Sequence, residues 1–178
     1  MTASSPWPDS LFEAGTDWKA RRSYLRSNCG EHISLHPDRW HGDVTVAERA
    51  LLGRARGRVL DVGSGPGRLV AHLALLGHPA LGLDMSPRAV AVAHERGAPI
   101  VHGSVFDTDL DGSWDTVLLM DGNVGIGGKP RRLFRRVAEL LAPGGSLLAE
   151  VEGPQVNGGY LKRDHRGPPS FNSSSGQT

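Results

Sequence analysis

The chain has 178 residues, a formal net charge of +1, 38% hydrophobic residues and 22% charged residues. These values are typical of one globular domain with a sizeable core, and the near-neutral charge disfavours a general attraction to nucleic acid or to membranes. No apolar run nears the length of a membrane span, and no secretory signal is visible between Met1 and Asp17. Cys29 is the only cysteine, so we expect no internal disulfide and a cytoplasmic location.

Residues 1–42 form an N-terminal segment that we expect to be irregular or to hold short helices between Leu11 and Leu25. Its aromatic residues are candidate anchors, among them Phe12, Trp18 and Tyr24. His36 and His41 have no further ligands at a spacing that favours a metal, so we expect no metal site. A helix capped by Asp43 is expected to follow and to run to about Gly53.

Strands and helices alternate between residues 43 and 152. We expect strands at about 57–62, 80–84, 99–102, 114–120 and 146–151, with helices at about 67–76, 87–96 and 130–141. This alternation predicts an α/β fold of the Rossmann-like, doubly wound type, with a mostly parallel sheet of about five strands. Ligands of such sheets bind at the carboxyl ends of the strands, so the residues that follow the strands are the candidates for function.

The first strand is followed by glycines at alternate positions: Gly63, Gly65 and Gly67. Glycine accepts positive φ and allows close approach to the backbone, and the helix that follows presents free amides at a positive helix end. This arrangement suits a nucleotide. The dinucleotide pattern G-x-G-x-x-G fails because Arg68 stands at its third glycine, and no Gly-Lys follows for a phosphate loop. The stretch from Asp61 to Gly67 instead resembles motif I of the class I S-adenosylmethionine (SAM) methyltransferases at all four fixed positions.

The resemblance implies that SAM is the cofactor and that its contacts lie at the strand ends. Asp84, at the end of the second strand, is expected to accept hydrogen bonds from the ribose hydroxyls. Asp61 is expected to order the glycine turn or to contact the amino group of the cofactor. The other expected cofactor-binding residues are Gly63, Ser64, Gly65, Gly67, Met85, Ser104, Val105 and Asp121. Ser104 replaces an acid that the family often has, so the adenine contact stays open among Ser104, the Val105 backbone and Asp107.

Asp121 and Asn123 follow the fourth strand and are the candidates for catalysis near the transferred methyl group. The Asp121 carboxylate is able to act as a base or to stabilise a developing charge. The alternative is a plain turn, because Asp, Gly and Asn all favour turns. This segment lacks the Asn/Asp-Pro-Pro-aromatic sequence of the DNA amino-methyltransferases, which disfavours DNA as the acceptor.

A cluster of arginines occupies the last predicted helix, at positions 131, 132, 135 and 136. A solvated helix face is the favoured interpretation, and contact with RNA or an acidic substrate is the alternative.

Residues 153–178 show no alternating strand pattern, and their polar composition is typical of disorder. Members of the family normally add a strand pair here, so we expect the sheet to lack it and the fifth strand to form an exposed edge. Three explanations are open, namely a truncated or frame-shifted product, which we favour, a sheet-edge partner or dimer, and an unusually short member.

These observations predict a SAM-dependent methyltransferase with a small-molecule acceptor and no nucleic-acid or membrane partner. A truncated module that binds SAM without turnover is the alternative. A NAD-dependent oxidoreductase is disfavoured by Arg68.

Overall fold

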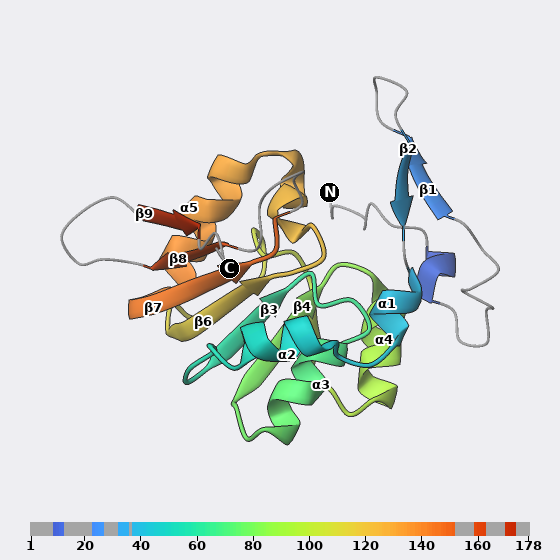
Figure 1. The fold of residues 1–178 in the computed structure, drawn as a ribbon, viewed down its shortest axis with the longest axis horizontal. Coiled ribbons are helices and arrows are strands. Elements are labelled where there is room, and N and C mark those ends of the chain that lie inside the picture. Colours follow the sequence, from blue (N-terminus) through green and yellow to red (C-terminus); the bar gives the residue numbers. More distant parts are fainter. Residues whose placement is uncertain are drawn as a thin grey trace, which may run out of the picture.

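The computed structural model describes residues 9–12, 23–26, 32–35, 37–151, 159–162 and 170–173. A seven-stranded sheet with the order β5-β4-β3-β6-β7-β8-β9 forms its centre (Figure 1). Five of these strands are parallel: β3 (Val59–Val62), β4 (Ala80–Asp84), β5 (Ile100–His102), β6 (Trp114–Leu119) and β7 (Leu141–Ala149). The strand order reverses between β3 and β6, so the expected α/β, doubly wound fold is confirmed and its switch point lies there.

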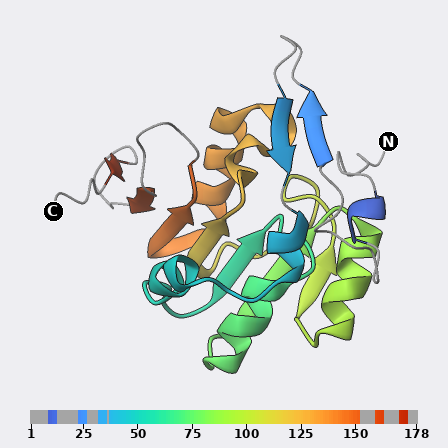
Figure 2. The same ribbon diagram turned by 45° about the vertical axis from the view of Figure 1, so that its right-hand side comes forward.

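Helices cover both faces of the sheet (Figures 1 and 2). They are α2 (Val46–Leu52), α3 (Arg68–Leu75), α4 (Pro87–Glu95) and α5 (Pro130–Leu140). Val117 and Leu119 of β6 belong to the core under α5, whereas Leu118 belongs to the core under α2 and α3. This alternation follows from the two-residue period of a strand. No helix in the described part of the chain has both the length and the apolar character that a bilayer span requires.

The helix starts follow local capping chemistry. Ser86 caps α4 as predicted, because its hydroxyl accepts a hydrogen bond from the amide of Ala89 at 3.2 Å. The predicted cap of α2 at Asp43 is wrong, and Thr45 holds that position. Thr45 and Glu48 form a reciprocal capping box, which satisfies two amides where Asp43 would satisfy one.

The N-terminal segment differs from the expected helices. It contains a 3-10 turn, η1 (Asp9–Phe12), a hairpin of β1 (Ser23–Arg26) and β2 (His32–Leu35), and a short helix, α1 (Pro37–His41). Phe12 is buried as expected of an anchor, while Trp18 lies outside the described residues. The hairpin was not predicted, because its two strands mix apolar and polar residues and lack the mostly apolar run that marks the equally short β3.

The C-terminal region also corrects the prediction of a missing strand pair. β8 (Gly159–Lys162) pairs antiparallel with β7, and β9 (Ser170–Ser173) pairs antiparallel with β8. The edge of β7 is therefore covered, which removes the reason for expecting a dimer through that strand. Backbone N–H and C=O groups alone form the hydrogen bonds between these strands, so β8 and β9 pair without an alternation of apolar and polar residues in the sequence. The rest of the predicted disordered tail lies outside the described residues.

Candidate functional site

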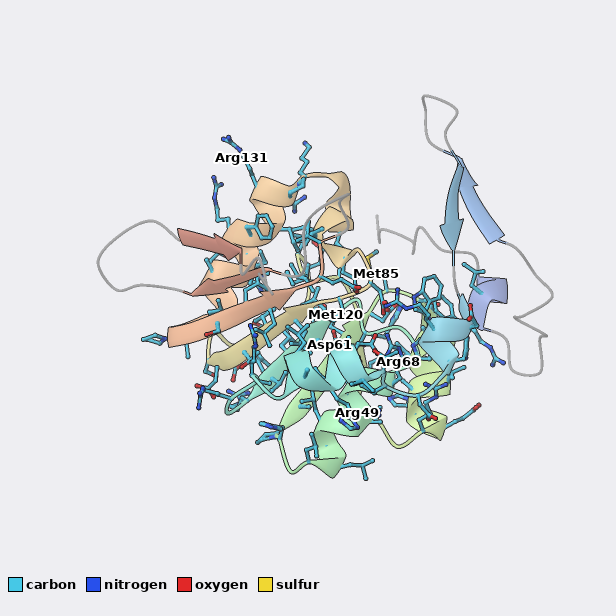
Figure 3. The ribbon with its side chains drawn as sticks, in the orientation of Figure 1. Arg49, Asp61, Arg68, Met85, Met120 and Arg131 are labelled. Carbon is cyan, nitrogen blue, oxygen red and sulfur yellow. The ribbon has the colours of Figure 1, made fainter. Side chains whose placement is uncertain are left out.

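A hollow of about 950 Å³, measured with its open mouth, lies at the carboxyl ends of the central strands. The wall is formed by the glycine turn after β3, the end of β4, the segments after β5 and β6, and two aromatic side chains of the N-terminal segment. Asp61, Met85 and Met120 gather near the centre of Figure 3, whereas Arg131 points away on α5.

The glycine turn adopts backbone angles that require glycine. Gly63, Gly65 and Gly67 have φ values of +76°, +52° and +73°. Gly63 and Gly65 line the hollow, as predicted. Gly67 has another role, because a Cβ there would lie 2.9 Å from the Cβ of Ala93 in α4 and 2.8 Å from that of Ala98. Gly67 therefore allows α3 to pack closely on α4 and is not part of the wall.

Asp84 connects the end of β4 to the glycine turn. Its Oδ2 accepts a hydrogen bond from the amide of Gly65, and its Oδ1 accepts one from the amide of Ser86, each at 2.8 Å. Burial raises the pKa of Asp84, although these amide donors act in the opposite direction. Each oxygen keeps a second lone pair for a ligand hydroxyl, so the predicted ribose contact fits the geometry and stays a prediction.

Asp61 is a buried carboxylate with neither oxygen hydrogen-bonded within the described structure. Burial and the nearby charge of Asp121 raise its pKa to about 7, against a smaller opposing effect of Arg68. The hydroxyl of Ser64, which also lines the hollow, likewise lacks a partner among the described residues. A buried polar group without a partner costs about 1–3 kcal/mol, so the hollow is suited to a ligand that donates hydrogen bonds or carries a positive charge.

Arg68, the first residue of α3, forms a buried ion pair that the sequence analysis missed. Its two terminal nitrogens donate to the two carboxylate oxygens of Glu48 at 2.8 and 2.6 Å. Burial opposes ionisation of Glu48, but hydrogen bonds from Arg68 and Thr45 lower its pKa to about 2. Arg68 also donates to Oδ2 of Asp121 at 3.1 Å. The pair thus joins α2 to the loop after β6.

Asp121 lines the hollow at the end of β6, as predicted. It is a non-glycine residue in the left-handed region, with φ +52°, and its amide donates to the carboxylate of Glu150 at 2.9 Å. Arg39 of α1 lies 3.6–3.7 Å from the carboxylates of Asp121, Glu150 and Glu48. Burial raises the pKa of Asp121, and the two arginines counteract this effect. The catalytic role proposed for Asp121 stays a prediction.

Asn123 holds the loop after β6 against the glycine turn. Its side-chain nitrogen donates to the carbonyl oxygens of Val62 at 3.0 Å and Gly63 at 2.8 Å. The loop itself forms η2 (Asn123–Gly128). These bonds explain the presence of an asparagine by loop geometry, and a catalytic role for Asn123 stays a prediction.

The residues expected near the adenine are only partly brought to the hollow. Met85 and Val105 line it, whereas Ser104 does not, and the Ser104 hydroxyl accepts a hydrogen bond from the amide of Phe106 at 3.2 Å. Two arginines of α5 brace this loop, since Arg132 lies 4.2 Å from the Phe106 ring and Arg136 donates to the Val105 carbonyl at 3.0 Å. Half of the predicted basic cluster is thus engaged within the protein.

Phe12 and Trp40 bring the N-terminal segment to the wall of the hollow. Their rings stack with centroids 5.9 Å apart. Phe12 is a predicted anchor, but aromatic composition alone could not place either ring at the site. In the part of the chain that the structure describes, no three His, Cys, Asp or Glu side chains are grouped to hold a metal ion.

A strand order that reverses beside a glycine turn, with a carboxylate at the tip of the next strand, defines a nucleoside-binding α/β domain. A family model described as a methyltransferase domain matches residues 59–145, which include this turn and carboxylate. This match confirms the resemblance to SAM-dependent methyltransferases found in the sequence.

Individual relatives agree with this family. The chain is 37% identical to a ubiquinone biosynthesis O-methyltransferase of Xanthomonas euvesicatoria, over 53% of this chain and 42% of the relative. It is 35% identical to a trans-aconitate 2-methyltransferase of Mycobacterium tuberculosis, over 61% of this chain and 41% of the relative. The chain therefore spans about two-fifths of both relatives. A SAM-dependent methyltransferase of Bacteroides fragilis, solved with S-adenosyl-L-homocysteine, has the same fold, with a TM-score of 0.65 at 24% identity, over 86% of this chain and 74% of that one.

Proposed function

We propose that this protein binds SAM in the hollow and transfers its methyl group to a small-molecule acceptor. The observation that carries the proposal is the buried carboxylate of Asp61, which has no described partner and lies beside the glycine turn. SAM is a cation that carries an ammonium donor, so it would satisfy this carboxylate. The methyltransferase family match supports the same cofactor.

The residues of the wall fit the parts of SAM. Gly63 and Gly65 have no side chain that would hold a ligand away from the backbone. Asp84 would accept the ribose hydroxyls while it keeps its bonds to the amides of Gly65 and Ser86. Val105 and Met85 would supply apolar contacts to the adenine.

SAM supplies an electrophilic methyl carbon, whose bond to sulfur breaks as the acceptor lone pair bonds to it. The protein has to bind the two molecules in line and to limit access of water. Phe12 and Trp40 would cover the hollow, and Asp121 is the candidate to stabilise charge near the transferred methyl group. One relative is named for ubiquinone biosynthesis and the other for trans-aconitate, which supports a small-molecule acceptor without specifying it.

Calorimetric titration with SAM, S-adenosylhomocysteine and NADH tests the cofactor. We expect binding of the two adenosyl ligands and none of NADH. Binding of NADH without SAM would overturn the proposal. A labelled-methyl screen of small acceptors then tests transfer, and SAM binding without any transfer would support the alternative of a module that binds but does not turn over. A cytoplasmic location remains a prediction.

A further inference from the structure

The charges on the wall of the hollow are unequal. Three carboxylates line it, from Asp61, Asp84 and Asp121, and in the described part of the chain Arg68 is the one cation among the lining residues. Arg68 is 6% exposed and contacts only one of these three acids directly, namely Asp121. The Asp121 carboxylate is therefore paired, whereas that of Asp61 is not.

Arg68 is fixed in place from its other side. The two-pronged bond to Glu48 occupies both terminal nitrogens, and Glu48 is itself held by the hydroxyl and amide of Thr45 at the start of α2. A guanidinium bound in this way cannot turn aside without breaking two buried charged hydrogen bonds. Nη2 bonds both Glu48 and Asp121, so α2 and the loop after β6 are joined by one side chain.

Asp121 needs such support. A non-glycine residue with φ +52° is strained by about 1–3 kcal/mol and persists only where its surroundings hold it. Two bonds do this, one from Arg68 to its carboxylate and one from its amide to Glu150. Together they set where the Asp121 carboxylate stands on the wall.

We infer that Glu48 and Arg68 are positioning residues that hold the Asp121 carboxylate for the cationic amino-acid part of SAM, on the same wall as Asp61. The inference rests on the proposed function. Neither residue of the pair touches the nucleoside contacts, which are made by Asp84 and the glycine turn. The affinity for a ligand that lacks the amino-acid part should therefore not depend on Glu48 and Arg68.

The test compares two ligands on four proteins. SAM and 5′-methylthioadenosine share the nucleoside, and only SAM has the amino-acid part. They are titrated into wild type, Arg68→Lys, Asp121→Asn and the double variant. Lysine keeps the charge but cannot bind Glu48 in two places and also reach Asp121. We expect Arg68→Lys to weaken SAM binding by about tenfold, which is about the contribution of one charged hydrogen bond. Binding of methylthioadenosine should change by less than about twofold.

The double variant shows whether Arg68 acts through Asp121. We expect Asp121→Asn to give the same selective loss, and the double variant to bind SAM no more weakly than Asp121→Asn alone. If Arg68 served only the stability of the domain, its replacement would weaken binding of both ligands equally. If Arg68 and Asp121 acted independently, their losses in SAM affinity would add in the double variant. Either result would overturn the inference while leaving the proposed function standing.

A second variant guards against failure of Arg68→Lys to fold. Glu48→Gln with Arg68→Gln replaces the pair by neutral amides, so neither member is left as a lone buried charge, and Arg39 stays 3.6 Å from the Asp121 carboxylate. We expect it to fold and to show the same selective loss of SAM, and unchanged SAM affinity in it would also overturn the inference. If wild type binds neither ligand, the proposed function fails first.

Discussion

The two ends of the hollow are built by different means. At one end, Asp84 and the glycine turn are tied together by backbone amides, between neighbouring strands. At the other end, Glu48, Arg68 and Asp121 are joined by side-chain ion pairs between residues 20 and 53 positions apart. The first end depends on backbone shape and the second on buried charges from three separate elements.

Because the two ends are built differently, mutations at each end should differ in their effects on ligand affinity and on stability. Backbone amides remain in place when a side chain is removed, so loss of the Asp84 carboxylate should affect ligand binding more than the stability of the domain. When one residue of a buried ion pair is removed, the other is left buried and charged without a partner, which destabilises the fold. Losses at the Arg68 end should therefore reach the stability of the whole domain.

The largest expected effect is on Arg68. Arg68→Met leaves the buried Glu48 carboxylate without its partner, and we expect the free energy of unfolding to fall by about 3–5 kcal/mol. Urea denaturation at pH 7 measures this. The control is Arg49→Met in α2 (labelled in Figure 3), because the Arg49 side chain is exposed and, among the described residues, donates only to the Val44 carbonyl. It should cost less than about 1 kcal/mol. Equal losses in the two variants would contradict the contrast between the two ends.

Gly67→Ala tests the close packing of α3 on α4 beside the glycine turn. The left-handed φ costs an alanine about 1–2 kcal/mol, and the overlap with Ala93 and Ala98 adds about 1–3 kcal/mol. We expect a loss of about 3 kcal/mol in urea denaturation. Gly77→Ala is the matched control, because Gly77 also has a left-handed φ, +82°, and nothing within 4 Å of its Cβ position. If the two variants lose the same stability, close packing of α3 on α4 is not why residue 67 is glycine.

Asp84→Ala should separate ligand binding from stability. Loss of charged hydrogen bonds to the ribose should weaken SAM binding by about 1.5–3 kcal/mol, measured by calorimetry. Asp109→Ala removes an exposed acid of the loop after β5 that does not line the hollow, and it should leave the affinity unchanged. Unchanged affinity in Asp84→Ala would remove Asp84 from the ribose contact.

The smallest effect concerns the pH dependence of SAM binding. The pKa of Asp61 is raised to about 7, and a cationic ligand favours its ionised form. The affinity for SAM should therefore be constant above pH 7 and fall by up to about tenfold, or 1.4 kcal/mol, for each pH unit below it. Titrations between pH 6 and 8.5 measure this. Asp61→Asn should remove the dependence, and a wild-type affinity that does not change with pH would count against Asp61 as the carboxylate that receives the cation.

The parts of the fold that could be predicted have strong local signals. Proline after Ser86 and alternating apolar stretches placed β4, β6 and α4 close to their observed bounds. The β1–β2 hairpin and the β8–β9 pair could not be predicted, because each of their strands has at most two apolar residues, whereas the equally short β3 has three. Their ladders are formed by backbone bonds that need no particular side chains.

The sequence by itself determined the α/β alternation, the glycine turn and the carboxylate at the end of β4, because residue type and spacing along the chain define each of them. Three further features depend on how the chain folds in space: Arg68 pairs with Glu48 and Asp121, Phe12 and Trp40 line the hollow, and Gly67 allows close helix packing. These contacts join residues far apart in the chain, and the free energy of an ion pair or a ring contact depends on distances in space that no local pattern encodes.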